Sequence, residues 1–561
     1  MTGVQTCALP IYPGSGSMSW SISTSTLSGG SWLSVAPNSG SSQSLAQPGS
    51  PINVTVNPQG LAAGVYYGTA QVSSSGILNS PQSITVSFTV QAAGSNPPAQ
   101  VSPTGVILTG VNGNSNTQTV NITNPGSSVL SYSTLLTTDD GQSWLTASPT
   151  SGSVAAGSTN AINLSATLTG LGTGLRHGTL RIVFSDGSVQ TVDAQLALAG
   201  AASGTGVRSC GATDLALEFQ SPSQSFQASA QVAIPLKVLV QDCNGNALTS
   251  SNTGVDILVG TSNTDIRLNY TGNGVWTGTW IPASASTVAT LTARAVEIVG
   301  SGNASGALTV NGVTGAALPN APPYVSAVVN AGSFLLPGLV APGTMVSIFG
   351  SGLADGQVQV FSTPFPNTLQ GAQFSVRGLP LPLFYASPGQ VNAVMPLGLT
   401  ADVRDQLIVV RDTNQSAPVD LLVADTAPGM FTVNSQGTGQ GAILVGGTSQ
   451  IAAPAGSIPG ALTGPATAGQ TVSIFLAGMG TVTNPPADGS PSTGTSLTTA
   501  TPTVNIGGVP ATVTYSGLAP GEVGLYQLNV VVPVGTQTGN AVPIFITIGN
   551  ETANFVTMAI Q

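Results

Sequence analysis

Short runs of alternating apolar and polar residues follow one another along most of the chain. Examples are Thr117–Thr123, Val232–Gln241 and the last residues, Phe555–Gln561. Alternation with a period of two is typical of strands that bury one face and expose the other. No stretch combines Ala, Leu, Glu and Lys at the 3.6-residue period that an amphipathic helix needs. The pattern therefore predicts an all-β protein built from antiparallel sheets.

The composition agrees with strands joined by frequent turns. The chain holds 71 glycines and 39 prolines, and 41% of its residues are hydrophobic. Only 5% are charged, against about 25% in an average soluble protein. Ser, Thr, Asn and Gln take the place of the missing charges, as expected for the outer faces of strands. A chain of 561 residues is too long for one core, and roughly three to five domains are expected.

Two stretches of the N-terminal half repeat each other. Residues 31–40 and 143–152 both read Ser-Trp-Leu-x-x-x-Pro-x-Ser-Gly. Further matches follow in the same order: Ile52–Val54 with Ile162–Leu164, and Gly60–Thr69 with Gly170–Thr179. The offset stays at 110–112 residues, which is the size of one β-sandwich domain with a linker. The second copy has more residues before its Trp144, so the first copy is expected to be truncated.

This repeat resembles the BACON family of bacterial β-sandwich modules. The family signature is a Trp-Leu pair followed by Pro-x-Ser-Gly and, later, by a Gly-x-x-x-Gly-Thr strand. The resemblance covers residues 18–91 and about 99–198, which gives two expected modules, 18–93 and 97–200. It implies an affinity for carbohydrate or mucin, a role that has been proposed for BACON modules.

Residues 206–315 form a third unit without a close internal copy. Its segment Gly274–Pro282 is similar to the aromatic-x-x-x-aromatic-x-Pro strand of bacterial immunoglobulin-like repeats, and Asn320–Tyr324 follows as a linker. Cys210 and Cys243 bracket two expected strands of this unit. An even cysteine count in such a chain favours a disulfide formed in an oxidising compartment. Two buried free thiols are the alternative.

A second repeat pair fills the C-terminal part of the chain. Gly343–Phe349 matches Gly469–Phe475, and Gln390–Pro396 matches Gln527–Pro533. The whole segment 322–561 resembles an uncharacterised C-terminal domain family first described from Solibacter-type soil bacteria. Its hallmarks are Ala327–Phe334, Pro388–Asn392, Ala427–Phe431 and Gly507–Thr512. The halves 322–432 and 433–561 each resemble an IPT/TIG type of immunoglobulin-like domain, and the family carries no assigned activity.

The first residues of the chain are unlike the rest. Residues 1–11 resemble a translated sequencing-library adapter, so residues 1–17 are set aside as adapter-derived or disordered. Cys7 then leaves the cysteine count, and the natural N-terminus, with any signal peptide, is expected to lie upstream.

The charge and the hydropathy of the chain argue against two kinds of partner. The net charge is −10, and Lys237 is the single lysine beside eight scattered arginines. Nucleic-acid binding needs a basic stripe that displaces counterions from phosphates, and the sequence has none. No apolar run reaches the roughly 20 residues that would span a bilayer. We therefore expect neither a nucleic-acid partner nor membrane insertion.

Residues able to carry out chemistry are few. The one histidine, His177, would have to serve any Ser-His-Asp or Cys-His site, yet the first repeat has Tyr67 at the same position. One histidine beside a disulfide leaves no tetrahedral zinc set. Carboxylates occur as Asp139-Asp140 and as Asp402, Asp405 and Asp412, where solvated turns are the alternative to a glycosidase pair. No catalytic residue, metal or cofactor is expected.

Two features leave a binding role open. Asp242, Asn244 and Asn246 alternate oxygen donors, as a calcium loop would, but a tight turn is the alternative. Trp276 and Trp280 are four residues apart in a strand and share one face. They form either a paired platform that stacks on sugars or part of the core. Trp32 and Trp144, equivalent in the two repeats, are expected in the core.

These features predict a tandem array of about five immunoglobulin-like antiparallel β-sandwich domains. The expected function is that of a non-enzymatic secreted or cell-surface modular protein, which adheres to or binds a glycan or an extracellular matrix. The alternative is a structural stalk or spacer for a catalytic or binding domain encoded upstream.

Overall fold

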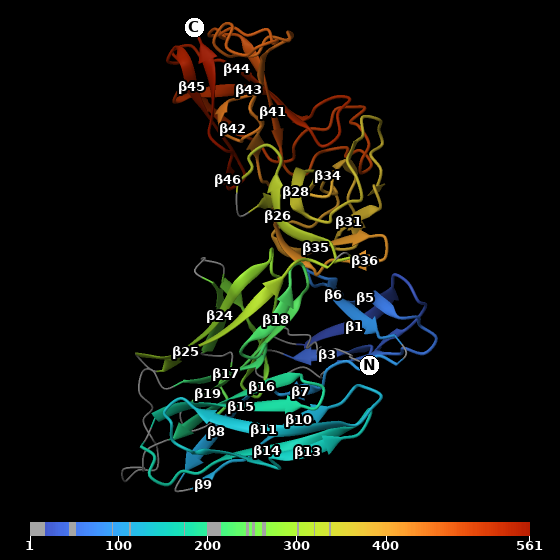
Figure 1. Cartoon of the computed structure of the whole chain (residues 1–561). Helices are drawn as coiled ribbons and strands as arrows, with labels where there is room; N and C mark the ends of the chain where they lie inside the picture. Colours follow the sequence, from blue (N-terminus) through green and yellow to red (C-terminus); the bar gives the residue numbers. More distant parts are fainter. Residues whose placement is uncertain are drawn as a thin grey trace. The chain divides into compact units, whose positions relative to one another are not determined.

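The computed structural model describes residues 17–43, 52–92, 94–111, 114–172, 174–198, 215–242, 246–249, 253–260, 265–299, 302–318, 320–335 and 338–561. These residues form strands, turns and loops, and they contain no helix (Figure 1). A membrane-spanning apolar helix is accordingly absent from the described part of the chain. The strands form separate sheets around several apolar cores. The predicted fold class, an all-β tandem array of sandwiches, is confirmed.

The predicted segments 18–93, 97–200, 206–315, 322–432 and 433–561 are called modules 1 to 5 below. The chain also divides into two compact units, which are described separately. The first unit comprises residues 1–19, 31–66 and 87–321, and the second comprises residues 20–30, 67–86 and 322–561. Modules 2 and 3 therefore belong to the first unit and modules 4 and 5 to the second, whereas module 1 contributes to both.

Module 1 is built from strands β1 (Ser17–Thr26), β2 (Leu33–Ala36), β3 (Ser39–Gln43), β4 (Asn53–Val56), β5 (Gly64–Ser73) and β6 (Gln82–Val90). They form a sheet of order β3-β1-β5-β6 and a separate β2-β4 pair. Trp32, just before β2, is buried, and its ring centroid lies 5.6 Å from that of Phe88 and 6.4 Å from that of Tyr66.

Module 2 contains β7 (Gln100–Ser102), β8 (Gly105–Val111), β9 (Asn114–Ser115), β10 (Gln118–Thr123), β11 (Leu130–Thr138), β12 (Leu145–Ser148), β13 (Ser151–Val154), β14 (Thr159–Ala166), β15 (Gly174–Phe184) and β16 (Val189–Leu198). Sheets of order β12-β14-β10-β7 and β13-β11-β15-β16-β8-β9 enclose its core. Trp144 lies in that core, 1% exposed, against alternating residues such as Ile122 and Leu164.

Module 3 contains β17 (Ala216–Ser221), β18 (Phe226–Ser229), β19 (Ile234–Gln241), β20 (Thr253–Val259), β21 (Asp265–Arg267), β22 (Asn269–Gly272), β23 (Val275–Trp280), β24 (Ser286–Val299) and β25 (Gly302–Gly315). Its sheets have the orders β17-β19-β23-β22 and β18-β25-β24-β20-β21. The long hairpin of β24 and β25 is visible in Figure 1.

Module 4 contains β26 (Tyr324–Asn330), β27 (Leu339–Val340), β28 (Met345–Ser351), β29 (Val358–Gln359), β30 (Thr368–Leu369), β31 (Ala372–Val376), β32 (Leu379–Pro380), β33 (Leu383–Ala386), β34 (Gln390–Val394), β35 (Val403–Arg411), β36 (Asn414–Gln415), β37 (Val419–Val423) and β38 (Gly429–Met430). Sheets of order β26-β28-β34-β33-β29 and β27-β37-β35-β31-β30 surround its core. The short β38 pairs with a strand of module 5.

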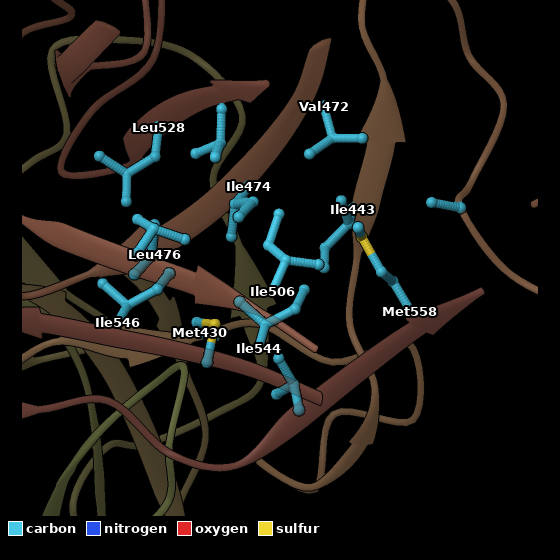
Figure 2. Close-up of a cluster of buried hydrophobic side chains, with 14 of the residues drawn as sticks. Met430, Ile443, Val472, Ile474, Leu476, Ile506, Leu528, Ile544, Ile546 and Met558 are labelled. Atoms are coloured by element: carbon cyan, nitrogen blue, oxygen red, sulfur yellow. The ribbon is translucent and has the colours of Figure 1, made fainter. Parts of the chain in front are cut away.

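Module 5 contains β39 (Gly439–Gln440), β40 (Ile443–Val445), β41 (Thr471–Ala477), β42 (Thr503–Ile506), β43 (Val509–Leu518), β44 (Tyr526–Val531), β45 (Gly539–Ile548), β46 (Glu551–Thr552) and β47 (Val556–Ile560). Strand β43 pairs first with β42 and then with β44, so one continuous sheet folds over the core. Figure 2 shows that core, where Ile474, Ile506 and Ile544 point toward one another.

In each of modules 2 to 5 one pair of strands departs from the predicted antiparallel pattern. An early strand pairs parallel with a late strand of the module: β8 with β16, β18 with β25, β27 with β37 and β39 with β47. In module 2 the first extended segment is split between the sheets, because β7 pairs with β10 and β8 with β16. Pro103 lies between β7 and β8 and lacks the N–H that a continuous strand would need.

Candidate functional site

The two candidate binding tryptophans lie in the core of module 3. Trp276 and Trp280 are 3% and 9% exposed, and both belong to its apolar cluster. Their rings pack on Tyr270 and Phe226, with centroids 5.2 Å and 6.0 Å apart. They share one face of β23 as expected, but that face points inward. This burial matches the core alternative for Trp276 and Trp280, in which neither indole offers a ring face to a sugar.

The other candidate residues of module 3 are described only in part. Cys210 and Cys243 lie outside the described residues, so their disulfide remains a prediction. Asp242 accepts hydrogen bonds from the backbone and the side-chain amide of Asn246, at 2.7 Å and 2.8 Å. Both carboxylate oxygens of Asp242 thus accept from Asn246, which is consistent with the tight-turn alternative.

The single histidine, His177, lies on β15 of module 2, and its side-chain partner is an amide. His177 is half-buried on β15, and the amide of Gln195 donates to its Nε2 at 3.2 Å. Burial lowers its pKa, and the nearby Asp139 carboxylate partly offsets that effect. Asp140 forms an ion pair with Arg176 at 2.6 Å. Its pKa is lowered, first by the backbone N–H of Gln142 and then by Arg176.

The aspartates of module 4 are not brought together. Asp402 and Asp412 are exposed residues with positive φ, which is typical of turns, at opposite ends of the nine-residue strand β35. At about 3.3 Å per residue, such a strand keeps them far beyond the spacing of a catalytic pair. Asp405 is buried on β35, and burial raises its pKa while Arg377 acts in the opposite direction.

Two hollows in the described part of the chain offer no acid–base pair. A hollow of about 200 Å³ in the first unit is lined by Pro58, Phe88 and neighbouring residues, without Asp, Glu or His. A cavity of about 10 Å³ in the second unit, roughly the size of one water molecule, has Asp488 as its one ionisable lining residue. Neither hollow brings two titratable groups into contact.

An exposed aromatic pair lies on the outer face of module 5. Phe545 on β45 and Phe555, just before β47, are 45% and 53% exposed. Their ring centroids are 6.0 Å apart at an interplanar angle of 61°. The β45–β47 register, with Ile544 opposite Val556, places the two rings side by side. Among the aromatic ring pairs of the described residues, this one alone has both rings exposed.

The outer face of the strands that flank the pair is rich in uncharged hydrogen-bonding groups. Asn505 lies directly across from Phe545 on β42, and Thr503, Thr547 and Thr557 share this face. Strands β42, β43, β45 and β47 contain no Asp, Glu, Lys or Arg. The opposite face of β45 carries Val542, Ile544, Ile546 and Ile548 into the core. We call the outer face formed by Thr503, Asn505, Phe545, Thr547, Phe555 and Thr557 the aromatic face.

The sequence reasoning missed this face, although a signal for it exists. In β45 the apolar residues at every second position show which side chains point into the core. Phe545 lies between them and therefore points outward, at a position where Thr or Ser is usual. An aromatic residue at an outward position of such a strand is therefore the pattern that would have identified the aromatic face.

Comparison with known families supports the BACON-like character of one predicted module. Residues 98–199 match the family described as the viral BACON domain. This stretch is module 2, so its BACON-like character is shown, although the match covers a minority of the chain. The BACON-like assignment of module 1, the immunoglobulin-like assignment of module 3 and the IPT/TIG and Solibacter-type assignments of modules 4 and 5 remain predictions. A comparison with curated proteins finds no match.

Several solved structures are similar to parts of the chain. SGBP-B of the Bacteroides ovatus mixed-linkage glucan utilization locus, solved with a mixed-linkage heptasaccharide, is 10% identical over 62% of this chain and 70% of its own, with a TM-score of 0.28. A protein of unknown function from Porphyromonas gingivalis is 15% identical over 34% and 95%, with a TM-score of 0.16.

The CsuC–CsuE chaperone and tip adhesion subunit complex of Acinetobacter baumannii is 12% identical over 39% of this chain and 99% of its own, with a TM-score of 0.19. At these identities and TM-scores the similarity identifies no function.

Proposed function

We propose that this chain is a non-enzymatic, secreted or cell-surface modular protein that binds a neutral polysaccharide through the aromatic face of module 5. The observation that carries the proposal is the exposed Phe545–Phe555 pair on a sheet face without charges. Large apolar rings exposed in pairs on a soluble domain are unusual, because burial would stabilise them. A ligand that covers both rings accounts for their exposure.

The chemistry of the face suits a sugar better than a charged ligand. Sugar rings present apolar C–H faces that can lie on an aromatic ring, while their hydroxyl groups need donors and acceptors nearby. Asn505 supplies both kinds of group, and the threonine hydroxyls around the pair supply more. Because no ionised side chain lies on these strands, the face offers nothing to pair with a uronic acid or a sulfate.

The match of module 2 to the BACON family supports the same class of function. Carbohydrate or mucin binding has been proposed for modules of this type. An extracellular or cell-surface location follows from the proposed ligand and from the predicted Cys210–Cys243 disulfide, which needs an oxidising compartment.

The test measures binding of the full chain to soluble neutral polysaccharides, such as β-glucan, xyloglucan and galactomannan, by calorimetry or affinity electrophoresis. Each ring is expected to contribute about 0.5–1.5 kcal/mol. Phe545→Ala or Phe555→Ala should therefore weaken binding about 2- to 12-fold. The matched control is Phe361→Ala, since Phe361 is an unpaired phenylalanine that is 83% exposed in module 4.

Polygalacturonate is the charged comparison ligand and should bind more weakly than the neutral chains. Equal losses in Phe361→Ala and Phe545→Ala, or neutral polysaccharides that fail to bind the native chain, would remove the glycan proposal. Binding of a protein to the aromatic face, with no glycan binding, would do the same.

The stalk or spacer alternative is favoured by a different observation. Modules 2 and 3 share a buried contact in the first unit, as described below, and such contacts stiffen a tandem array. The full-length gene tests this alternative. A signal peptide followed directly by module 1, with no upstream domain, would contradict it.

A further inference from the structure

Strand β17 of module 3 packs against the outer face of a module 2 sheet. Ile107 of β8 and Ala197 of β16 form an apolar cluster with Ala216 of β17, and Leu239 packs against it. The hydroxyl of Thr104 donates to the carbonyl of Gln220 at 2.6 Å. We call this contact the module 2–3 interface, and all of it lies within the first unit.

Gly105 permits the close approach of the two modules. A Cβ on Gly105 would lie 2.1 Å from the carbonyl oxygen of Phe219, a distance that no side chain can accept. Glycine is therefore needed at position 105 for β17 to cross β8. The interface is specified by the sequence of both modules.

Glu218 is buried in this interface without a partner. It is 0% exposed, and neither of its carboxylate oxygens has a hydrogen-bond partner. Its Oε2 lies 3.3 Å from the position that a Cβ on Gly105 would take, and Gly105 pairs with Asp193 across β8 and β16. Gln195, two residues further along β16, is buried and has an unpartnered Oε1. Three buried acceptor oxygens thus lack donors.

The groups that face Glu218 do not supply a positive charge. On the module 2 side the carboxyl of Asp193 acts on Glu218. Behind it, Asp139 acts on Asp193 and on the half-buried His177, which Gln195 contacts. On the module 3 side, the sole lysine, Lys237 of β19, is exposed, and no ion pair involving Glu218 occurs among the described residues. No group of three acidic, histidine or cysteine side chains in the described chain could hold a metal ion.

An ionised carboxylate left in this position would strongly destabilise the docked state, because burial removes its hydration and nothing replaces it. The smallest species that can neutralise it is a proton, which also turns one carboxylate oxygen into a donor for a neighbouring acceptor. We propose that modules 2 and 3 are held together by a proton-dependent interface, in which Glu218 must be protonated, so that the two modules dock more firmly as the pH falls.

The pKa shifts determine whether docking strengthens or weakens as the pH falls. Burial, and then the Asp193 charge, raise the pKa of Glu218 well above its ordinary value of 4.5 in the docked state. Burial also raises the pKa of Asp193, with the Asp139 charge adding to it and the Gln224 N–H opposing it. Docking is therefore strongest below pH 4.5 and weakens as the pH rises toward the raised pKa of Glu218.

Titration of His177 would change docking in the opposite direction. Burial lowers its pKa, so its protonation would weaken the docked state as the pH falls. The direction of the pH dependence therefore shows which group governs the interface.

The test is hydrogen–deuterium exchange of the full chain between about pH 5 and pH 8, with rates corrected for intrinsic exchange. One proton changes the opening equilibrium by up to about tenfold per pH unit. Protection of peptides spanning 105–111 and 216–221 should rise toward low pH, while a module 5 peptide spanning β45 serves as the internal reference. Glu218→Gln, a neutral isostere, should keep high protection at pH 8 and lose the pH dependence of these two peptides.

Two further variants separate docking from folding. Gly105→Ala should lower protection in both peptides at every pH, because its Cβ would strike Phe219. Gly254→Ala is the matched control, since a Cβ at that exposed position on β20 meets nothing within 4 Å. Asp193→Asn should move the transition to lower pH, because it removes the like charge that raises the pKa of Glu218.

Three results would overturn the proposal. They are an unchanged pH dependence in Glu218→Gln, a protection that falls as the pH falls, and a protection that responds to millimolar Ca²⁺ instead of pH.

Discussion

Asn330 shows how one polar side chain explains a sequence hallmark of the C-terminal segment. Its amide donates to the carbonyls of Ala427 and Ala477 at 2.6 Å and 3.4 Å, and its Oδ1 accepts from the N–H of Gly332 and Ser333. Asn330 and Ala427 belong to two of the motifs that were singled out in the sequence, far apart along the chain. Their contact gives both motifs a structural reason, because buried backbone groups need partners.

Asn330→Ala is therefore expected to destabilise the second unit. The variant leaves buried carbonyls and N–H groups unpaired, at a cost of about 2–4 kcal/mol. Thermal and denaturant unfolding of the full chain would measure the change. Asn434→Ala is the control, because exposed Asn434 makes a single local contact with the N–H of Gln436. Similar stability losses in both variants would contradict this role of Asn330.

At the scale of strands, the alternation of residues predicted the fold well and the surface poorly. Strands such as Val232–Gln241 were identified because apolar residues at every second position can all be buried together only on one face of a strand. The same alternation cannot say which partner strand a segment takes, so the parallel pair β8–β16 was not foreseen. The alternation also did not determine whether Trp276 lies in the core or on the surface, because both faces of a sandwich strand accept an aromatic residue. Phe545 was overlooked for the converse reason, since its outward position follows from its buried neighbours.

The burial of Trp276 leads to a prediction about β23. Trp276→Ala should destabilise module 3 by about 3–5 kcal/mol, because it opens a large cavity beside Tyr270. Trp276→Phe should recover much of that loss. Polysaccharide binding through the aromatic face should stay unchanged in both variants, and calorimetry of unfolding and of binding on the same samples would separate the effects. A loss of binding at unchanged stability would restore the tryptophan platform.

At the scale of the whole chain, sequence repeats predicted modules 1, 2, 4 and 5 but not the contacts between modules. Strands β5 and β6 of module 1 contribute residues 67–86 to the second unit, where they meet module 4. Buried Gln415 donates from Nε2 to the hydroxyls of Thr69 and Thr85, each at 2.8 Å. Arg377 donates to the carbonyl of Ser80 at 2.8 Å. Such polar contacts span hundreds of residues and have no periodicity, so a single sequence does not reveal them.

Gln415→Leu tests whether this contact fixes module 1 on module 4. Leucine keeps a similar volume but cannot donate, so the Thr69 and Thr85 hydroxyls lose a buried partner at a cost of about 2–3 kcal/mol. Hydrogen exchange of the full chain should then accelerate in peptides from β5, β6 and β36, with β45 as the reference. Gln373→Leu is the control, because exposed Gln373 bonds only to Thr368 within module 4. If β5 and β6 keep their protection in Gln415→Leu, the hydrogen bonds of Gln415 do not hold the two modules together, and their contact must depend on other groups such as Arg377.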